Sequence, residues 1–270
     1  MATAVNHLIA RLPAGDRDRL LSVCKRVELV LSTVLSERGE KTVWTWFPID
    51  SFISLISLVD DHGGVEVGMV GAEGMVGAQL ALGVPTSPVR ALVQGSGHAW
   101  RVAAPDLTRL LKASAALRRV MNRYVYVLMS QQATSAACLR FHQIDQRLAR
   151  WLLMSQDRAG ATTFHLTQEF LAYMLGVRRV GTAVATSALV REGLIEFRHG
   201  QIRVFDRDRL KQAACSCYAS DRRSYEALFG SAHAEDRRAS EDGGRELSPP
   251  PPSDVPLRAH HHGLVGDTDD

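Results

Sequence analysis

The segment from Arg140 to Lys211 is rich in arginine. It contains twelve basic residues against seven acidic ones, and eleven of the twelve are arginine. Guanidinium groups hold phosphates through paired N–H donors, so this composition points to a phosphate or nucleic-acid partner. Two adjacent arginines, Arg178 and Arg179, lie within the segment. Adjacent residues on a helix are about 100° apart, so we expect these two side chains to do different work.

The four cysteines are the first candidates for metal or redox chemistry, because thiolates bind zinc and iron–sulfur clusters. Cys24 and Cys138 lie far apart in the chain, and Cys215 and Cys217 are closer together than the usual zinc pair. They are also too few and too scattered for a disulfide framework. We therefore expect reduced cysteines with structural or incidental roles and no metal site.

Histidines are the second candidates. His62 and His98 each lack a partner at metal-ligand spacing, and the triplet His260 to His262 is interpreted as an incidental feature of a flexible tail. His62 and Glu66 keep one alternative open, a cupin-like metalloenzyme, although that chemistry needs several converging ligands. We expect no catalytic residues, no cofactor and no enzyme activity.

Length and composition allow a sizeable folded core. The chain has 270 residues, of which 46% are hydrophobic and 23% charged, and its 21 glycines follow no Gly-x-y period. Collagen-like and wholly disordered proteins are thereby excluded. No run of about 20 apolar residues is present, and the first ten residues show no signal-peptide pattern. We expect a cytoplasmic protein with no membrane partner.

The last forty residues have a different composition. Ser231 to Asp270 holds nine acidic residues and four arginines, together with the run Pro249 to Pro252 and hardly any large apolar groups. Such a segment has too little apolar surface to fold, so we expect a disordered acidic tail over 231–270.

Residues 27–103 have the pattern of a β structure. Short apolar segments alternate with turn signals such as Glu37-Arg38-Gly39 and Gly95-Ser96-Gly97, at intervals of roughly 8 to 12 residues. This spacing is typical of an antiparallel β-sandwich or small barrel. A short helix over 106–111 is expected to close it.

From Leu117 the apolar period changes to alternating steps of four and three residues. This heptad seam runs through Leu117, Met121, Tyr124 and Leu128 and continues to Cys138. One interpretation is a long helix packed on its own sheet. The other is a dimerisation helix, which we favour because a helix of about 24 residues is longer than a domain-sized sheet.

The arginine-rich segment predicts a short helix, a tight turn, a second helix and a hairpin. Thr167 is suited to cap a helix that stops at Gly176, and a second helix is expected over 177–192. Alternating apolar strands then flank the two-residue turn His199-Gly200. Helix, turn, helix and hairpin in this order make a winged helix-turn-helix.

The chain resembles the Crp/Fnr family of bacterial transcription regulators over about residues 7–217. The motifs that carry the resemblance are Leu166 to Ala172, Leu175 to Arg179, Leu189 to Ile195, Gly68 to Gly77 and Ser87 to Gln94. It implies an α+β fold with an N-terminal antiparallel, cyclic-nucleotide-binding-like β-roll as sensor domain (1–112). A long dimerisation helix (113–139) and a C-terminal winged helix-turn-helix DNA-binding domain (140–217) follow.

The resemblance also implies a set of DNA contacts. Arg179 matches the base-reading arginine of the family, whose fork can bond guanine O6 and N7 together, and Arg178 is expected to hold a phosphate. The remaining expected DNA-binding residues are Thr182, Thr167 and Gln168 in the helix pair and Arg198, His199 and Arg203 on the wing.

The second helix departs from the family pattern where a polar or acidic base-reading residue is usual, because Val180, Gly181, Ala183 and Val184 occupy that face. Val180 and Val184 can contact thymine methyl groups or lie in the core, and both interpretations stay open. Gly181 inside a helix costs about 1 kcal/mol relative to alanine. Either a close backbone approach to DNA compensates or the helix is weak.

The sensor pocket departs from the family pattern as well. Members that bind cyclic nucleotides carry Gly-Glu and Arg-Ser/Thr pairs, whereas the matching positions here are Gly77-Ala78 and Arg90-Ala91. Each missing partner for a buried polar group costs about 1 to 3 kcal/mol, so we expect cAMP and cGMP to bind poorly. Iron–sulfur members need three clustered N-terminal cysteines, and Cys24 stands alone there.

Together these features predict a homodimeric transcription regulator that binds double-stranded DNA at a two-fold symmetric site, under control of an unidentified signal at a degenerate cyclic-nucleotide-type pocket. RNA polymerase is a further candidate partner. The alternatives are a constitutive DNA binder with a vestigial sensor and the cupin-like metalloenzyme.

Overall fold

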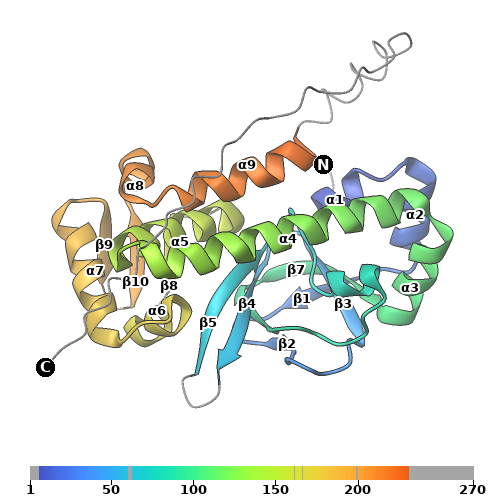
Figure 1. Cartoon of the computed structure of the whole chain (residues 1–270), viewed down its shortest axis with the longest axis horizontal. Helices are drawn as coiled ribbons and strands as arrows, with labels where there is room; N and C mark the ends of the chain where they lie inside the picture. The colour runs from blue at the N-terminus through green and yellow to red at the C-terminus, as the bar shows by residue number, and fades with distance from the viewer. Residues whose placement is uncertain (1–5, 60–62, 161, 166, 199, 231–270) are drawn as a thin grey trace, which may run out of the picture. The chain divides into compact units, whose positions relative to one another are not determined.

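The computed structural model describes residues 6–59, 63–160, 162–165, 167–198 and 200–230 (Figure 1). The expected tail over 231–270 and residue His199 lie outside the described residues. The N-terminal half contains α1 (His7–Ala10), α2 (Ala14–Ser22), β1 (Lys25–Leu29), β2 (Val34–Ser36), β3 (Trp44–Pro48), β4 (Phe52–Val59), β5 (Gly63–Val70), the 3₁₀ helix η1 (Ala78–Leu82), β6 (Arg90–Gly95), β7 (Gly97–Ala103) and α3 (Ala104–Ala113).

The strands β1 to β7 form the antiparallel β-roll that the spacing of turns predicts. One sheet has the order β1-β7-β3 and the other the order β2-β6-β4-β5. Apolar side chains of both sheets, such as Trp46 and Val93, meet in one buried cluster. A second cluster joins the roll to the helices around it and includes Phe47, Leu20 and Leu107.

The helix α4 (Ala115–Phe141) follows the roll. The hydroxyl of Ser114 caps its first turn by accepting a hydrogen bond from Leu117 N, at 3.0 Å. Its 27 residues span about 40 Å at 1.5 Å per residue, and Figure 1 shows it running along the roll towards the C-terminal elements.

The predicted dimerisation seam faces the interior of the chain. Leu117, Met121 and Tyr124 are buried at 1 to 2% exposure in the cluster that joins α4 to the roll, and Leu128 packs partly buried beside it. This corrects the dimerisation residues expected from sequence, because the β-roll already covers these side chains. The heptad pattern therefore arises because these residues are buried against the chain's own β-roll.

A second face of α4 is exposed and also follows a heptad spacing. Asn122, Tyr126, Met129, Ala133 and Ala136 are four or three residues apart, and all five are exposed. Tyr126 and Met129 each expose 62% of their surface, which is unusual for large apolar side chains. We call these five residues the α4 strip.

The C-terminal module follows α4 with α5 (Ile144–Ala159), β8 (Thr163–His165), α6 (Gln168–Leu175), α7 (Arg179–Arg191), β9 (Ile195–Arg198), β10 (Gln201–Val204) and α8 (Arg207–Ala213). Gly176 ends α6 with φ +61°, a left-handed cap that glycine adopts without strain. β8, β10 and β9 form a three-stranded antiparallel sheet, and the helices pack on it through one apolar core. The expected winged helix-turn-helix is therefore present.

A final helix, α9 (Cys217–Phe229), was not expected from sequence. It returns along α4, where Ser224 and Ser130 are joined by a hydrogen bond of 3.2 Å. The buried ion pair Arg150–Asp221, at 2.6 Å, ties it to α5, and Phe229 packs into the core of the N-terminal half. No helix among the described residues is both long and apolar enough to cross a membrane.

The burial of the seam predicts the stability of a matched pair of variants. Met121→Ala removes a fully buried side chain and leaves a cavity, so we expect the free energy of unfolding to fall by about 2 to 5 kcal/mol. Leu31→Ala, at a half-exposed position, should change it by less than about 0.5 kcal/mol. Urea unfolding followed by circular dichroism measures both, and equal losses in the two variants would contradict the packing of α4.

Candidate nucleic-acid interface

The helix α7 presents one continuous exposed face. Val180 and Val184 expose 75% and 67% of their surface, and Ala183, Ser187 and Arg191 are on the same side of the helix. Val180 and Val184 therefore do not lie in the core, the alternative that the sequence left open. The face is mostly apolar, and such side chains recognise thymine methyl groups in a major groove.

Arg178 and Arg179 begin this helix. Arg178 is the N-cap residue, and Arg179 is the first helical residue. The Arg179 guanidinium forms an exposed ion pair with Glu169 of α6, at 3.1 Å. Exposed pairs of this kind contribute at most about 1 kcal/mol, so a guanine or a phosphate can displace Glu169 at little cost.

Thr182 lies on the opposite side of α7. Its side chain is 0% exposed, and its hydroxyl has no hydrogen-bond partner among the described residues. The expectation that Thr182 contacts DNA is therefore wrong, because the turn of the helix directs position 182 into the core while 180, 183 and 184 face outward. Ala183, which the sequence placed on the base-reading face, is exposed, whereas Ser187 was missed although a helical wheel centred on Val180 would have included it.

Gly181 has a packing role that the sequence did not show. A Cβ added there would come within 2.9 Å of Ile144 Cδ1 on α5. The glycine thus permits close contact between α5 and α7, and this contact offsets part of its low helix propensity. Neither a DNA contact nor a weak helix is needed to explain it.

The helix α6 begins with a capped N-terminus. Thr167 Oγ1 accepts a hydrogen bond from Phe170 N at 3.1 Å, so its hydroxyl serves the cap. Thr167 itself is exposed, whereas Gln168 is half-buried and its Oε1 has no partner among the described residues. Thr167 therefore lies at the surface, at the N-terminus of α6. The same helix carries Glu169, which pairs with Arg179.

The wing carries two described arginines at its surface. Arg198 of β9 pairs with Glu196 at 2.7 Å, and the Arg203 guanidinium of β10 lies over the ring of Phe205, at 5.5 Å from its centroid. Both arginines are exposed, and Gly200 lies in the turn between their strands with φ +75°. These positions suit contacts to flanking phosphates.

The N-terminal half holds an apolar cavity between the roll and α4. Gly77, Ala78, Ala91, Leu128 and Met129 are among its lining residues, and its volume is about 160 Å³. None of the described residues that line it is charged. Arg90, expected at the pocket, instead pairs with Glu37 at 2.8 Å and is absent from the described lining.

The family model for the Crp-like helix-turn-helix domain matches residues 146–213. Residues 146–213 are a Crp-like helix-turn-helix domain. The resemblance stated from sequence is thereby confirmed in this part of the chain. A comparison with curated proteins found no match.

Solved structures share the fold over most of the chain. FixK2 from Bradyrhizobium japonicum has 16% identity and a TM-score of 0.61, and the match covers 72% of this chain and 98% of that one. The c-di-GMP-responsive global regulator CLP of Xanthomonas campestris has 18% identity and a TM-score of 0.59, covering 72% and 100%. A CRP-family transcriptional regulator from Thermus thermophilus has 16% identity and a TM-score of 0.59, covering 70% and 96%. The fold is thus that of Crp/Fnr regulators.

The Crp-like domain is held against the roll by polar contacts. Arg158 of α5 forms a largely buried ion pair with Glu73 at 2.7 Å, and the Tyr225 hydroxyl of α9 donates to the Glu73 carbonyl at 3.2 Å. A Cβ added to Gly64 of β5 would lie 2.7 Å from the hydroxyl of Tyr173 on α6. The β4–β5 hairpin therefore packs directly on α6, the first helix of the helix-turn-helix pair.

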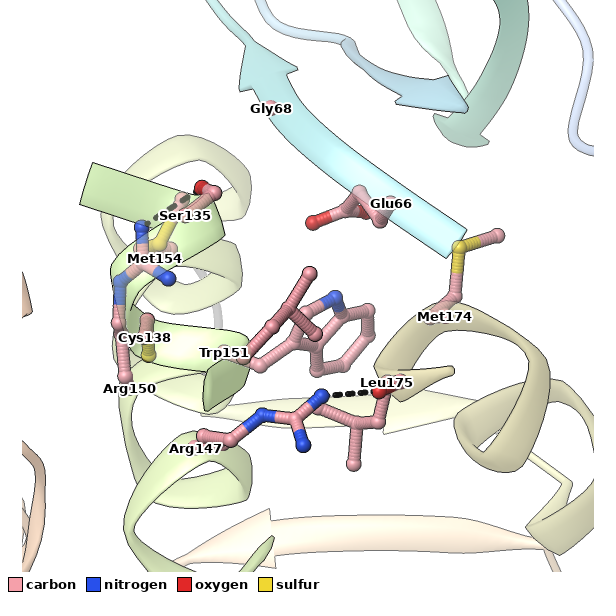
Figure 2. Close-up of a pocket in the computed structure, with 11 residues that line it drawn as sticks. Glu66, Gly68, Ser135, Cys138, Arg147, Arg150, Trp151, Met154, Met174 and Leu175 are labelled. Atoms are coloured by element: carbon pink, nitrogen blue, oxygen red, sulfur yellow. Dashed lines mark hydrogen bonds between the residues drawn. The ribbon is translucent and has the colours of Figure 1, made fainter. Parts of the chain in front are cut away.

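A small cavity lies where the two halves meet (Figure 2). Figure 2 shows Glu66 of β5 facing Trp151 of α5, with Arg147 and Arg150 on the far side. Burial raises the pKa of Glu66 to about 7, although a hydrogen bond from Ser54 at 2.5 Å and nearby positive charges oppose this rise. A carboxyl with a pKa near neutral thus lies at the junction of the roll and the Crp-like domain.

Glu66 predicts a pH dependence of stability. The pKa of Glu66 is 4.5 when the side chain is exposed and about 7 in the folded chain. The stability that the protonated carboxyl gives the folded chain is therefore fully present below pH 4.5 and is lost as the pH rises through 7. Glu66→Gln mimics the protonated form, so at about pH 8 we expect it to be more stable than the unmodified chain. Thermal unfolding from pH 5 to 8 measures this, with exposed Glu28→Gln as control. Parallel pH curves for the chain and Glu66→Gln would refute the assignment.

Proposed function

We propose that this protein is a homodimeric transcription regulator that reads a two-fold symmetric DNA site through α7. The observation that carries the proposal is the exposed face of α7 within a Crp-like helix-turn-helix domain, with Arg178 and Arg179 at its N-terminal end. In such domains the residues near the N-terminus of the second helix approach the base edges in the major groove.

The roles of the DNA-binding residues follow from their exposure. Arg179 is the candidate for guanine, while Val180, Ala183 and Val184 offer methyl groups to thymine. Phosphate contacts are assigned to Arg178, to the first turn of α6 and to the wing arginines Arg198 and Arg203. We keep His199 on the wing as a candidate from sequence alone.

The α4 strip is the proposed dimer contact. A second copy of α4 packed on Tyr126, Met129 and Ala133 would bury two large exposed apolar side chains in a heptad seam. The exposed strip and the buried seam lie on different faces of the same helix. Dimerisation therefore leaves the packing of α4 on the roll intact.

The signal is proposed to enter the apolar cavity of the sensor half. Met129 belongs both to the α4 strip and to the cavity lining, so a bound molecule would contact the same helix that meets the second copy. The uncharged lining suits a small apolar ligand. It disfavours cAMP and cGMP, because their phosphate needs a cation and Arg90 is engaged by Glu37.

DNA selection with the purified full chain tests the proposal. We expect a two-fold symmetric site with half-sites about one helical turn apart. Arg179→Ala should weaken binding by about 1 to 3 kcal/mol and relax the preference at one position of each half-site. The matched control is Thr182→Val on the buried side of α7, which should leave affinity unchanged. Sequence-independent, salt-sensitive binding that is equal in all three proteins would refute the proposed readout.

The dimer contact is tested by a charge on the α4 strip. Met129→Arg places a guanidinium where a second copy would pack, so the chain should shift from dimer to monomer in sedimentation velocity. Val59→Arg, at an exposed apolar position of β4, should remain dimeric. A monomeric unmodified chain, or a fully dimeric Met129→Arg, would exclude this strip as the interface.

A further inference from the structure

Three segments that are distant in sequence bring four metal-binding side chains together. Cys138 lies in the last turn of α4, His142 is the residue that ends α4, and Cys215 and Cys217 lie where α8 passes into α9. One ligand atom from each of the four lies within 4.8 Å of the others. All three cysteines are free thiols with buried side chains.

The spacing of the four atoms matches a single tetrahedral metal ion. Zinc bonds to sulfur at about 2.3 Å and to nitrogen at about 2.0 Å, so two thiolates on one ion lie about 3.8 Å apart and a thiolate and an imidazole about 3.5 Å apart. Cys138 Sγ and Cys215 Sγ are 3.5 Å apart, and Cys217 Sγ and His142 Nδ1 are 3.6 Å apart. Both separations are close to edges of such a tetrahedron.

Local structure explains how the four ligands converge. Cys138 and His142 are four residues apart, so the end of α4 presents them on one side, and His142 N donates to the Cys138 carbonyl at 3.1 Å. Cys215 N donates to the Gln146 carbonyl of α5 at 3.5 Å, which holds the α8–α9 connection beside them. The ligand pairs are thus Cys-x₃-His and Cys-x-Cys, and neither pair by itself is recognisable in the sequence as a metal-binding motif.

We propose that Cys138, His142, Cys215 and Cys217 bind one zinc ion. Four protein ligands fill a tetrahedral zinc, which is the arrangement of structural sites and leaves no position for a substrate. Binding releases the three thiol protons to solvent. An iron–sulfur cluster fits less well, because its ligands bind different iron atoms and must lie further apart.

The charges around the cluster suit this ion. A zinc ion with three thiolates and a neutral imidazole carries a net charge of −1. Two guanidinium groups, Arg147 and Arg150, act on the Cys138 and Cys215 sulfurs, and Figure 2 shows Arg147, Arg150 and Cys138 on one side of the junction cavity. Arg147 donates to the Leu175 carbonyl and has no carboxylate partner among the described residues, so its charge is free to balance the site.

The ion would fix the joint between the two halves. It would link the end of α4 and the α4–α5 connection, which precede the Crp-like domain in the chain, to the start of α9, which follows that domain. This inference does not depend on the proposed DNA site, because its readout is metal content.

The test uses the full chain purified without a polyhistidine tag and under reducing conditions. Elemental analysis should find about one zinc per chain, and Co²⁺ in its place should give the absorption of a tetrahedral thiolate complex. Cys215→Ser and His142→Ala should lose the zinc, and a chelator should lower the melting temperature of the unmodified chain but not of these variants.

Two controls separate this site from other metal binding. Cys24→Ser removes the one cysteine outside the cluster, and replacing His260, His261 and His262 by alanine removes the histidine triplet of the tail. Both should keep one zinc per chain. The proposal is overturned if the reduced chain binds neither zinc nor Co²⁺ in tetrahedral form, if either control loses the metal, or if the purified chain holds a Cys138–Cys215 disulfide and takes up no metal after reduction.

Discussion

The burial of one face of α4 against the β-roll is the constraint on which the rest of the structure depends. It fixes Leu117, Met121 and Tyr124 in the core and thereby decides which face remains for a second copy. The same helix closes the apolar cavity of the N-terminal half through Leu128 and Met129. At its far end it delivers Cys138 and His142 to the connection between α8 and α9. One helix thus contacts the apolar cavity, the proposed dimer partner and the joint to the Crp-like domain.

The two halves are joined by polar groups as well as by packing. Glu73 accepts from Arg158 of α5 and from Tyr225 of α9, so one residue of the roll is bound to both of its C-terminal neighbours. Glu66 stands nearby with a pKa raised to about 7, and the hairpin that carries it packs on α6. Buried polar groups of this kind are stable only with their partners in place, so a change in the position of α5 or α9 would disturb the contacts of Glu73.

Much of the architecture could be predicted from sequence, because its signals are local. Turns at regular intervals predicted the β-roll, and Thr167 and Gly176 predicted the limits of α6. The periodicity of α4 predicted its length but not its orientation, since two heptad faces share that helix. Thr182 was assigned to the wrong side of α7 for a similar reason. A match to a position in the family's second helix does not show which side of that helix packs on α5. The helix α9 was missed because its contacts are made with residues far earlier in the chain, such as Ser130, which lies 94 positions before Ser224.

The sequence by itself determined the order of the roll, the long helix and the winged helix-turn-helix, the arginine-rich composition of the Crp-like domain, and the small apolar side chains at Ala78 and Ala91. These depend on residue type and on neighbours a few positions away, which the chain carries without folding. Only the tertiary structure decided that Val180 and Val184 face outward, that Gly181 accommodates Ile144, and that Arg90 pairs with Glu37. It also brought Cys138 to Cys215 across 77 positions. Contacts between such distant residues arise from the packing of whole helices, and no local pattern specifies them.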